Sequence, residues 1–203
     1  MPGAASLLLA MLFAVMLFAI PAQPCRAQSQ RSFDLGLAYT QERSKFLGPA
    51  AGNYFYLRGA TVDAAADLYK GIGLSAEGTG ISSTNLEGDI DIEHVQFLVG
   101  PRYTFNLGRN SDFAWNRHGG AFVEGKVGYT FATSGLYPVN GIVQNHAAGL
   151  TYMGGGGVNF KIYHRFDLRL VEVDYERTQL PNGTTNIQNT LRVSSGINFH
   201  FGS

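Results

Sequence analysis

The segment RLVEVDYERT, residues 169–178, carries an acidic side chain at every second position: Glu172, Asp174 and Glu176. Apolar residues fill the gaps between them. Side chains two apart on a β-strand share a face, so this pattern gives one carboxylate face and one apolar face. In a soluble sandwich the acids would meet water and the valines a core. In a membrane barrel the acids would point inward and the valines would contact lipid.

Charged residues also occupy the polar faces of the other alternating segments. If these faces line a narrow barrel, the charges share a small interior, where an unpaired charge is strongly unfavourable. We therefore predict a structural network of salt bridges that fills the lumen. Acids outnumber bases in it, so cations would be preferred if ions passed. The predicted members are Asp34, Asp63, Asp67, Glu77, Arg102, Glu124, Lys126, Glu172, Asp174 and Arg192.

The sequence offers little for catalysis or cofactor binding. It contains neither G-x-S-x-G nor H-E-x-x-H, and its glycine-rich stretches lack the Lys-Ser/Thr that holds phosphates. His146 with Ser134 is a possible nucleophile and base pair, which we interpret as solvated loop residues. Asp89, Asp91 and Glu93 could suit calcium, yet a solvated edge explains them as well. We expect no enzyme activity, no cofactor and no metal.

Composition narrows the class of protein. Of 203 residues, 15% are charged, against about 25% in an average soluble domain. The 15 basic and 15 acidic residues balance, and no basic stripe is present to hold a phosphate backbone. Nucleic acid is therefore not expected as a partner.

The first residues have the character of a secretory leader. Residues 5–20 form an apolar run that is shorter than the roughly 20 residues of a transmembrane helix. We place cleavage after Ala27, with Ala22 as the alternative. This gives a signal peptide over 1–27 and a single barrel domain over 28–203. The single cysteine lies in the leader, so the mature domain would have no disulfides.

Eight segments alternate with period two and are long enough for the roughly 9–11 residues of a tilted membrane strand. Long polar connections follow the first, third, fifth and seventh of them, and short turns follow the second and sixth. This alternation is typical of membrane barrels, although the fourth connection, 106–118, is long where a short one is expected. The segments are 32–40, 60–68, 72–80, 93–105, 121–131, 150–160, 166–178 and 190–201. The long connections are 41–53, 82–91, 132–147 and 178–188, and the short ones are 69–71 and 161–165.

The polar faces decide between the sandwich and the barrel. They are rich in glycine and carry both signs of charge, which suits a narrow lumen better than a wet sheet surface. Aromatic residues lie near the strand ends, where interface girdles would be. In 166–178 the alternation changes phase, and a one-residue β-bulge near Leu170 would restore it. The sequence predicts an all-β fold, an eight-stranded antiparallel up-and-down transmembrane β-barrel.

The leader, the eight amphipathic strands and a last strand ending GINFHF resemble small outer-membrane β-barrels of the OmpA-type transmembrane domain. GGGGVNFKIYHRFDLRLVEVDYERT is similar to the glycine-rich sixth strand, tight turn and seventh strand of that superfamily. The resemblance implies location in a bacterial outer membrane, with lipid, lipopolysaccharide and the barrel-assembly machinery as partners. It also implies that the aromatic end of the last strand, Phe199 and Phe201, is the assembly signal.

Three functions remain open from the sequence. The first is a structural or surface-interaction barrel whose long outer loops contact a ligand, lipopolysaccharide or other cells. The second is a narrow pore for ions or small solutes. The third is a periplasmic lipocalin-like carrier of an apolar ligand, in which the two faces would be reversed.

Overall fold

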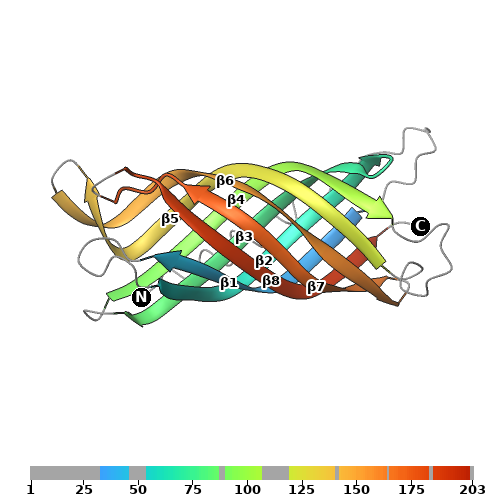
Figure 1. Ribbon diagram of the computed structural model, residues 1–203, viewed down its shortest axis with the longest axis horizontal. Coiled ribbons are helices and arrows are strands. Elements are labelled where there is room, and N and C mark those ends of the chain that lie inside the picture. The colour runs from blue at the N-terminus through green and yellow to red at the C-terminus, as the bar shows by residue number, and fades with distance from the viewer. Residues whose placement is uncertain are drawn as a thin grey trace.

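The computed structural model describes residues 33–45, 54–86, 90–106, 119–139, 142–163, 165–182 and 185–201. The predicted signal peptide and its cleavage site lie outside these ranges. Eight antiparallel strands form a closed barrel in sequence order, with β8 pairing back to β1 (Figure 1). They are β1 (Phe33–Lys45), β2 (Tyr54–Tyr69), β3 (Ile72–Leu86), β4 (Ile90–Asn106), β5 (Gly119–Val139), β6 (Ile142–Tyr163), β7 (Phe166–Thr178) and β8 (Gln188–Phe201).

The two faces of each strand follow the predicted assignment. On β7, Glu172 and Asp174 are buried at 2% and 0% exposure, whereas Val173 between them is 43% exposed. Around the whole barrel, polar side chains are buried and large apolar side chains are exposed, the reverse of an ordinary soluble protein. The barrel therefore has an apolar outer belt and a polar interior. The lipocalin-like carrier required the valines inside and the acids outside, so that alternative is wrong.

The bulge predicted near Leu170 is present. On β6, Val158 pairs with Val171 and the next residue, Asn159, pairs with Arg169, so Leu170 has no register partner there. The extra residue resets the alternation on β7. Arg169 therefore shares the inward face with Glu172, three residues away.

The predicted loop lengths were wrong at three connections, and in the first of them residues 41–45 belong to β1. Residues 82–86 and 90–91 belong to β3 and β4, and most of 132–147 belongs to a long β5–β6 hairpin. The polar residues of these segments suggested loops. A two-stranded ribbon that is exposed to water on both faces can pair through its backbone without alternating apolar residues. At the left of Figure 1, the ends of β5 and β6 reach beyond the neighbouring strands.

The first short turn is as predicted, and the second is shorter than predicted, because residues 161–163 belong to β6. Lys70 and Gly71 link β2 to β3 with φ values of 48° and 83°. Two consecutive positive φ angles are the signature of a type I′ hairpin turn, which favours glycine. Residues 107–118, within the anomalous fourth connection, lie outside the described ranges. Within those ranges, no helix has the length and apolar character needed to cross a bilayer.

Candidate functional site: the charged lumen

The barrel interior holds an unusual concentration of charge. Seven carboxylates and four cations of the described residues are buried on the inward faces of the strands. Strand alternation puts them there, since each lies on the face opposite the lipid belt. The carboxylates are Glu42, Asp63, Glu77, Glu124, Glu172, Asp174 and Glu176, and the cations are Arg102, Lys126, Arg169 and Arg192.

The centre of the lumen is organised by two cations from β5 and β8. Lys126 Nζ lies 2.6 Å from Glu77 Oε2 and also pairs with Glu124. Arg192 donates to Glu77 and, through Nη2, to Asp174 Oδ2 at 3.0 Å. Each cation therefore joins two carboxylates, and Glu77 belongs to both pairs. This continuous chain ties β3, β5, β7 and β8 together across the interior.

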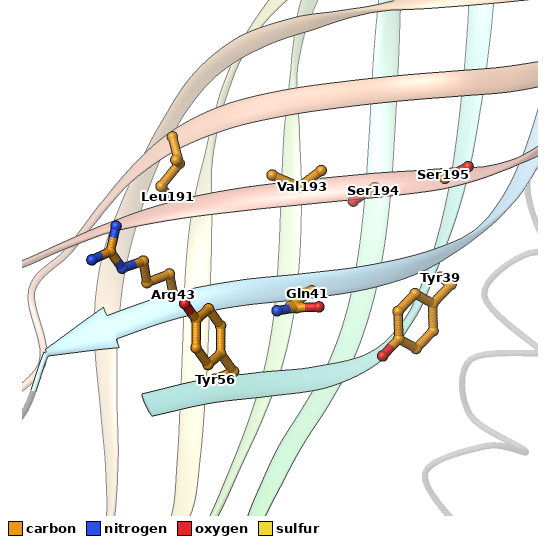
Figure 2. A pocket seen from close by; sticks show the side chains of 8 residues that line it. All are labelled: Tyr39, Gln41, Arg43, Tyr56, Leu191, Val193, Ser194 and Ser195. Atoms are coloured by element: carbon orange, nitrogen blue, oxygen red, sulfur yellow. The ribbon is translucent and has the colours of Figure 1, made fainter. Parts of the chain in front are cut away.

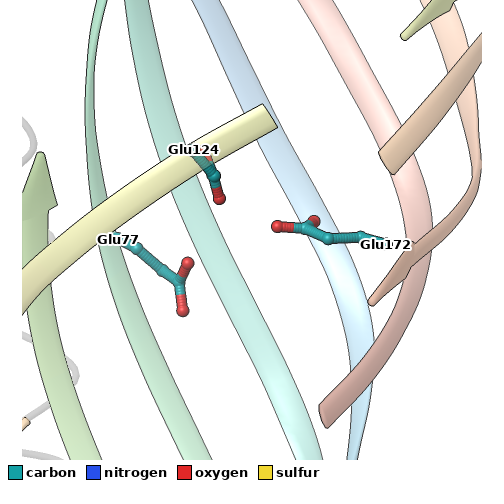
Figure 3. Close-up of side chains that lie close together, drawn as sticks. All are labelled: Glu77, Glu124 and Glu172. Carbon is teal, nitrogen blue, oxygen red and sulfur yellow. The ribbon is translucent and has the colours of Figure 1, made fainter. Parts of the chain in front are cut away.

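Three of the carboxylates, Glu77, Glu124 and Glu172, converge so closely that an oxygen of each lies within 4.8 Å of the others (Figure 3). Such a triad could in principle bind a metal ion. Here the Lys126 ammonium already bridges Glu77 and Glu124. The protein thus supplies its own cation, and the cluster is a salt-bridge centre.

A second cluster lies around the Arg169 guanidinium. Its Nη1 donates to Asp63 Oδ1 and Glu172 Oε2, each at 2.7 Å. Its Nη2 donates to Asp63 Oδ2 at 3.0 Å and Asn198 Oδ1 at 2.9 Å. The two-pronged contact with Asp63 is the strongest geometry available to an Arg–carboxylate pair. Glu172 also completes the triad described above, so the two clusters meet there.

An aromatic ring supports this second cluster. Arg102 lies 3.8 Å above the centre of the Phe122 ring, and Arg169 lies 5.3 Å from the same centre. Both distances are within the range of a cation–π contact. A side chain at Gly157 would come within 2.8 Å of the ring. The glycine-rich run of β6 therefore makes room for Phe122.

Hydroxyl groups also fill part of the barrel interior, and further contacts lie near its two ends. Thr40 bonds Thr61 at 2.6 Å and Ser194 at 2.9 Å, which links β2, β1 and β8. At the end that carries the short turns, His200 contacts Asp34 at 2.6 Å and Asp167 at 2.8 Å.

At the opposite end, four buried apolar side chains form a cluster that we call the apolar cap: Ala132, Tyr137, Ala147 and Leu180. Gln179 N donates to Leu150 O at 2.8 Å, which holds the segment after β7 against β6. Burial raises the pKa of the Tyr137 phenol, in the hairpin beyond the membrane-spanning part of β5, to about 12. The phenol therefore stays neutral across the physiological range.

The outer surface has a groove of about 390 Å³ where β1, β2 and β8 run side by side (Figure 2). Most of its lining side chains point away from the lumen, and Arg43 lies toward the open ends of the strands. The Arg43 guanidinium stacks 3.6 Å over the Tyr54 ring. The lining residues are Tyr39, Gln41, Arg43, Tyr56, Leu191, Val193, Ser194 and Ser195.

Comparison with known proteins agrees with this geometry. The family model of the outer membrane protein beta-barrel domain matches residues 5–201. The chain belongs to this family. Its location is accordingly the bacterial outer membrane, as the sequence predicted.

Solved barrels of the same fold share little sequence with this family member. Neisserial surface protein A matches with a TM-score of 0.60 at 11% identity, covering 85% of this chain and 98% of that one. Ail, the attachment invasion locus protein of Yersinia pestis, in complex with the heparin analogue sucrose octasulfate, matches with 0.54 at 15% identity, covering 85% and 100%. No curated protein sequence matches the chain. The identities are low, so these likenesses establish the fold alone.

Eight of the ten predicted network residues lie together in the two central clusters of this family member. Asp34 lies apart from them, at the His200 end, and Asp67 is half-buried. Sequence reasoning missed Arg169. Counted in steps of two from Glu172 it falls on the outward face, and only the bulge at Leu170 turns it inward. Glu42 and Glu176 were also missed as lumen members, although Glu176 stood on the acidic face of the opening segment.

The remaining candidates are at the surface. His146 is exposed and hydrogen-bonds with Asn145 at 3.0 Å instead of with Ser134. Asp91 and Glu93 are exposed on β4, and Asp89 lies outside the described ranges. On β8, Phe201 is 51% exposed and its ring lies 6.0 Å from that of Phe33.

Proposed function

We propose that this chain is a non-enzymatic surface-interaction barrel, whose outer hairpin binds a partner outside the cell. The outer hairpin is defined as residues 134–139 and 142–147. Outer-membrane barrels place short turns in the periplasm and long connections outside. The turn at Lys70 and Gly71 therefore orients the outer hairpin toward the exterior.

The observation that carries the proposal is the free edges of this hairpin. The β4–β5 ladder ends where Glu93 pairs with Thr133, and the β6–β7 ladder begins at Thr151. Within the described residues, the strand pairs of the outer hairpin all lie between β5 and β6, as of Tyr137 with Gln144, and Leu180 packs at its base. Exposed strand edges offer unpaired N–H and C=O groups, to which an extended partner segment can add.

Side chains at the tip of the outer hairpin favour the same role. Ile142 and Val143 are 65% and 62% exposed. β6 has 22 residues, about twice what a tilted strand needs to cross the bilayer, so its tip extends into water. Exposed neighbouring apolar residues on a water-facing element are typical of an interaction site.

Lipopolysaccharide is the membrane partner that we propose. Arg43, Arg58 and Arg177 point outward from β1, β2 and β7 toward the exterior ends of those strands. Guanidinium groups bind phosphates in a two-pronged geometry, and the groove beside Arg43 can receive an acyl chain. Because the Ail structure holds a heparin analogue, a sulfated polysaccharide is a second anionic ligand to test against the same arginines.

Site-specific photo-crosslinking in cells tests the role of the hairpin. A photoreactive amino acid replaces Ile142 or Val143, and the matched control places it at Val127, an outward residue of the membrane-spanning part of β5. We expect discrete adducts of protein or polysaccharide from 142 and 143, and lipid adducts from 127. If all three positions gave lipid adducts alone, the hairpin would not be an interaction site.

A further inference from the structure

A compartment of the lumen between the central clusters and the apolar cap holds charge without a matching cation. Glu42 from β1, Gln96 from β4 and Glu176 from β7 are each 1% exposed. Gln96 Nε2 donates to Glu176 Oε1 at 2.7 Å across the barrel, which fixes these two side chains relative to each other. Thr178, beside this compartment, connects to Thr151 at 3.3 Å in the direction of the cap.

Four buried oxygens in this compartment form no hydrogen bond within the described part of the protein. They are Glu42 Oε2, Gln96 Oε1, Glu176 Oε2 and Thr190 Oγ1. The strand register brings three of their residues together, because Glu176 pairs with Thr190 on β8, and Glu42 pairs with Arg192 two residues further along. Buried polar groups are ordinarily satisfied, so a set of unpartnered oxygens in one place points to a missing ligand.

The other carboxylate oxygen of Glu42 and of Glu176 already accepts a hydrogen bond, which fixes the orientation of the oxygen without a partner. Ser44 donates to Glu42 Oε1 at 2.9 Å, and Thr178 donates to Glu176 Oε1 at 2.7 Å. Each carboxylate thus has one oxygen held by the wall and one without a partner. The two side chains are positioned by the barrel and are not free to turn toward water.

The charge balance of the interior identifies the kind of ligand. Of the seven buried carboxylates, five share the four buried cations in ion pairs. Glu42 and Glu176 form no ion pair among the described residues. Arg192 lies nearby but is engaged by Glu77 and Asp174. His94, two residues from Gln96 on β4, is also buried.

We propose that Glu42, Gln96, Glu176 and Thr190 bind a hard divalent cation of the calcium type. The two carboxylates supply two negative charges, and the amide and hydroxyl oxygens supply neutral ligands. Calcium takes six to eight oxygen ligands of these kinds, with water completing the set. The inner triad of Glu77, Glu124 and Glu172 does not compete, because Lys126 fills it. The bound ion would then link β1, β4, β7 and β8 beneath the apolar cap.

Calcium titration of the refolded protein in lipopolysaccharide-free zwitterionic micelles tests the site. Calorimetry should give one tight Ca²⁺ per chain, and chelation should lower the unfolding midpoint. At free Ca²⁺ of 100 times the dissociation constant, the folding equilibrium should shift about 100-fold toward the folded state. The double variant Glu42→Gln, Glu176→Gln keeps both wall hydrogen bonds, since an amide oxygen accepts from Ser44 and Thr178 as a carboxylate does.

This double variant should lose the tight Ca²⁺ and the midpoint shift, and in chelator it should be more stable than the wild type, because two buried carboxyl groups without a counter-ion are gone. Glu93→Gln, an exposed acid of β4, is the matched control and should bind Ca²⁺ as the wild type does. Wild-type protein without a calcium-dependent shift would overturn the proposal. A shift retained in the double variant would place the ion elsewhere and overturn it too. Neither result bears on the outer hairpin.

Discussion

Replacing Arg192 by methionine should destabilise the barrel more than any comparable change on its surface. Arg192 is fully buried and pairs with both Glu77 and Asp174. Glu77 keeps Lys126 as a partner, whereas Asp174 loses its ion pair. Removing one side of a buried pair leaves a charge without compensation, which costs about 3–5 kcal/mol. We expect a loss of that size in the free energy of unfolding of Arg192→Met.

Urea unfolding in lipid vesicles, followed by far-ultraviolet circular dichroism, measures this loss. Arg177→Met is the matched control, because Arg177 is an exposed arginine on the neighbouring strand and should cost less than about 1 kcal/mol in neutral lipid. Arg192→Met combined with Asp174→Asn removes both charges and should recover part of the stability, since the uncompensated carboxylate is gone. Equal losses for Arg192→Met and Arg177→Met would refute the idea that the network holds the barrel.

Three further changes test the faces, the packing and the assembly signal. Val173→Arg on the lipid face should cost about 2–4 kcal/mol and impair insertion into vesicles, whereas Val173→Leu should insert normally; normal insertion of the arginine variant would contradict the assignment of faces. Gly157→Ala should cost about 1–3 kcal/mol in urea unfolding, because its methyl group would contact the Phe122 ring and the Val171 carbonyl, while Gly154→Ala meets nothing within 4 Å and should be neutral. Phe201→Ala should slow assembly in cells, measured by pulse-chase, yet leave refolding in detergent unchanged. Phe33→Ala removes the same contact between the two rings and should assemble normally. Equal assembly defects in the two variants would show that assembly depends on the ring contact and not on the aromatic end of β8.

The faces of the strands could be predicted from the sequence because they depend on local alternation. Val173 and Asp174 occupy opposite sides in any strand, and the glycine and charge content of the polar side indicated which side is inside. Leu170 could be identified as a bulge from its parity alone. The register of Arg169 followed from that bulge, but its use as the centre of a cluster required the positions of Asp63 and Asn198 on other strands.

The partners across the lumen could not be predicted, because they depend on which strands face each other through the barrel. The contact of Gln96 with Glu176 joins β4 and β7, which are not neighbours in the sheet. Phe122 of β5 is buried beneath Arg102 of β4, a contact that the alternation within either strand does not reveal. The length of the outer hairpin could not be predicted either, since the polar residues around 134–147 are equally compatible with a loop and with a water-exposed two-stranded ribbon.

Conductance in planar bilayers tests the central claim, that a filled lumen leaves the outer surface as the site of function. Protein that shows a heat-dependent shift in gel mobility, and is therefore folded, is reconstituted at single-molecule density. A lumen filled by the Arg192 and Arg169 clusters predicts no steady conductance above that of the bare bilayer. A steady, cation-selective current carried by wild-type protein would contradict this account and show a narrow pore.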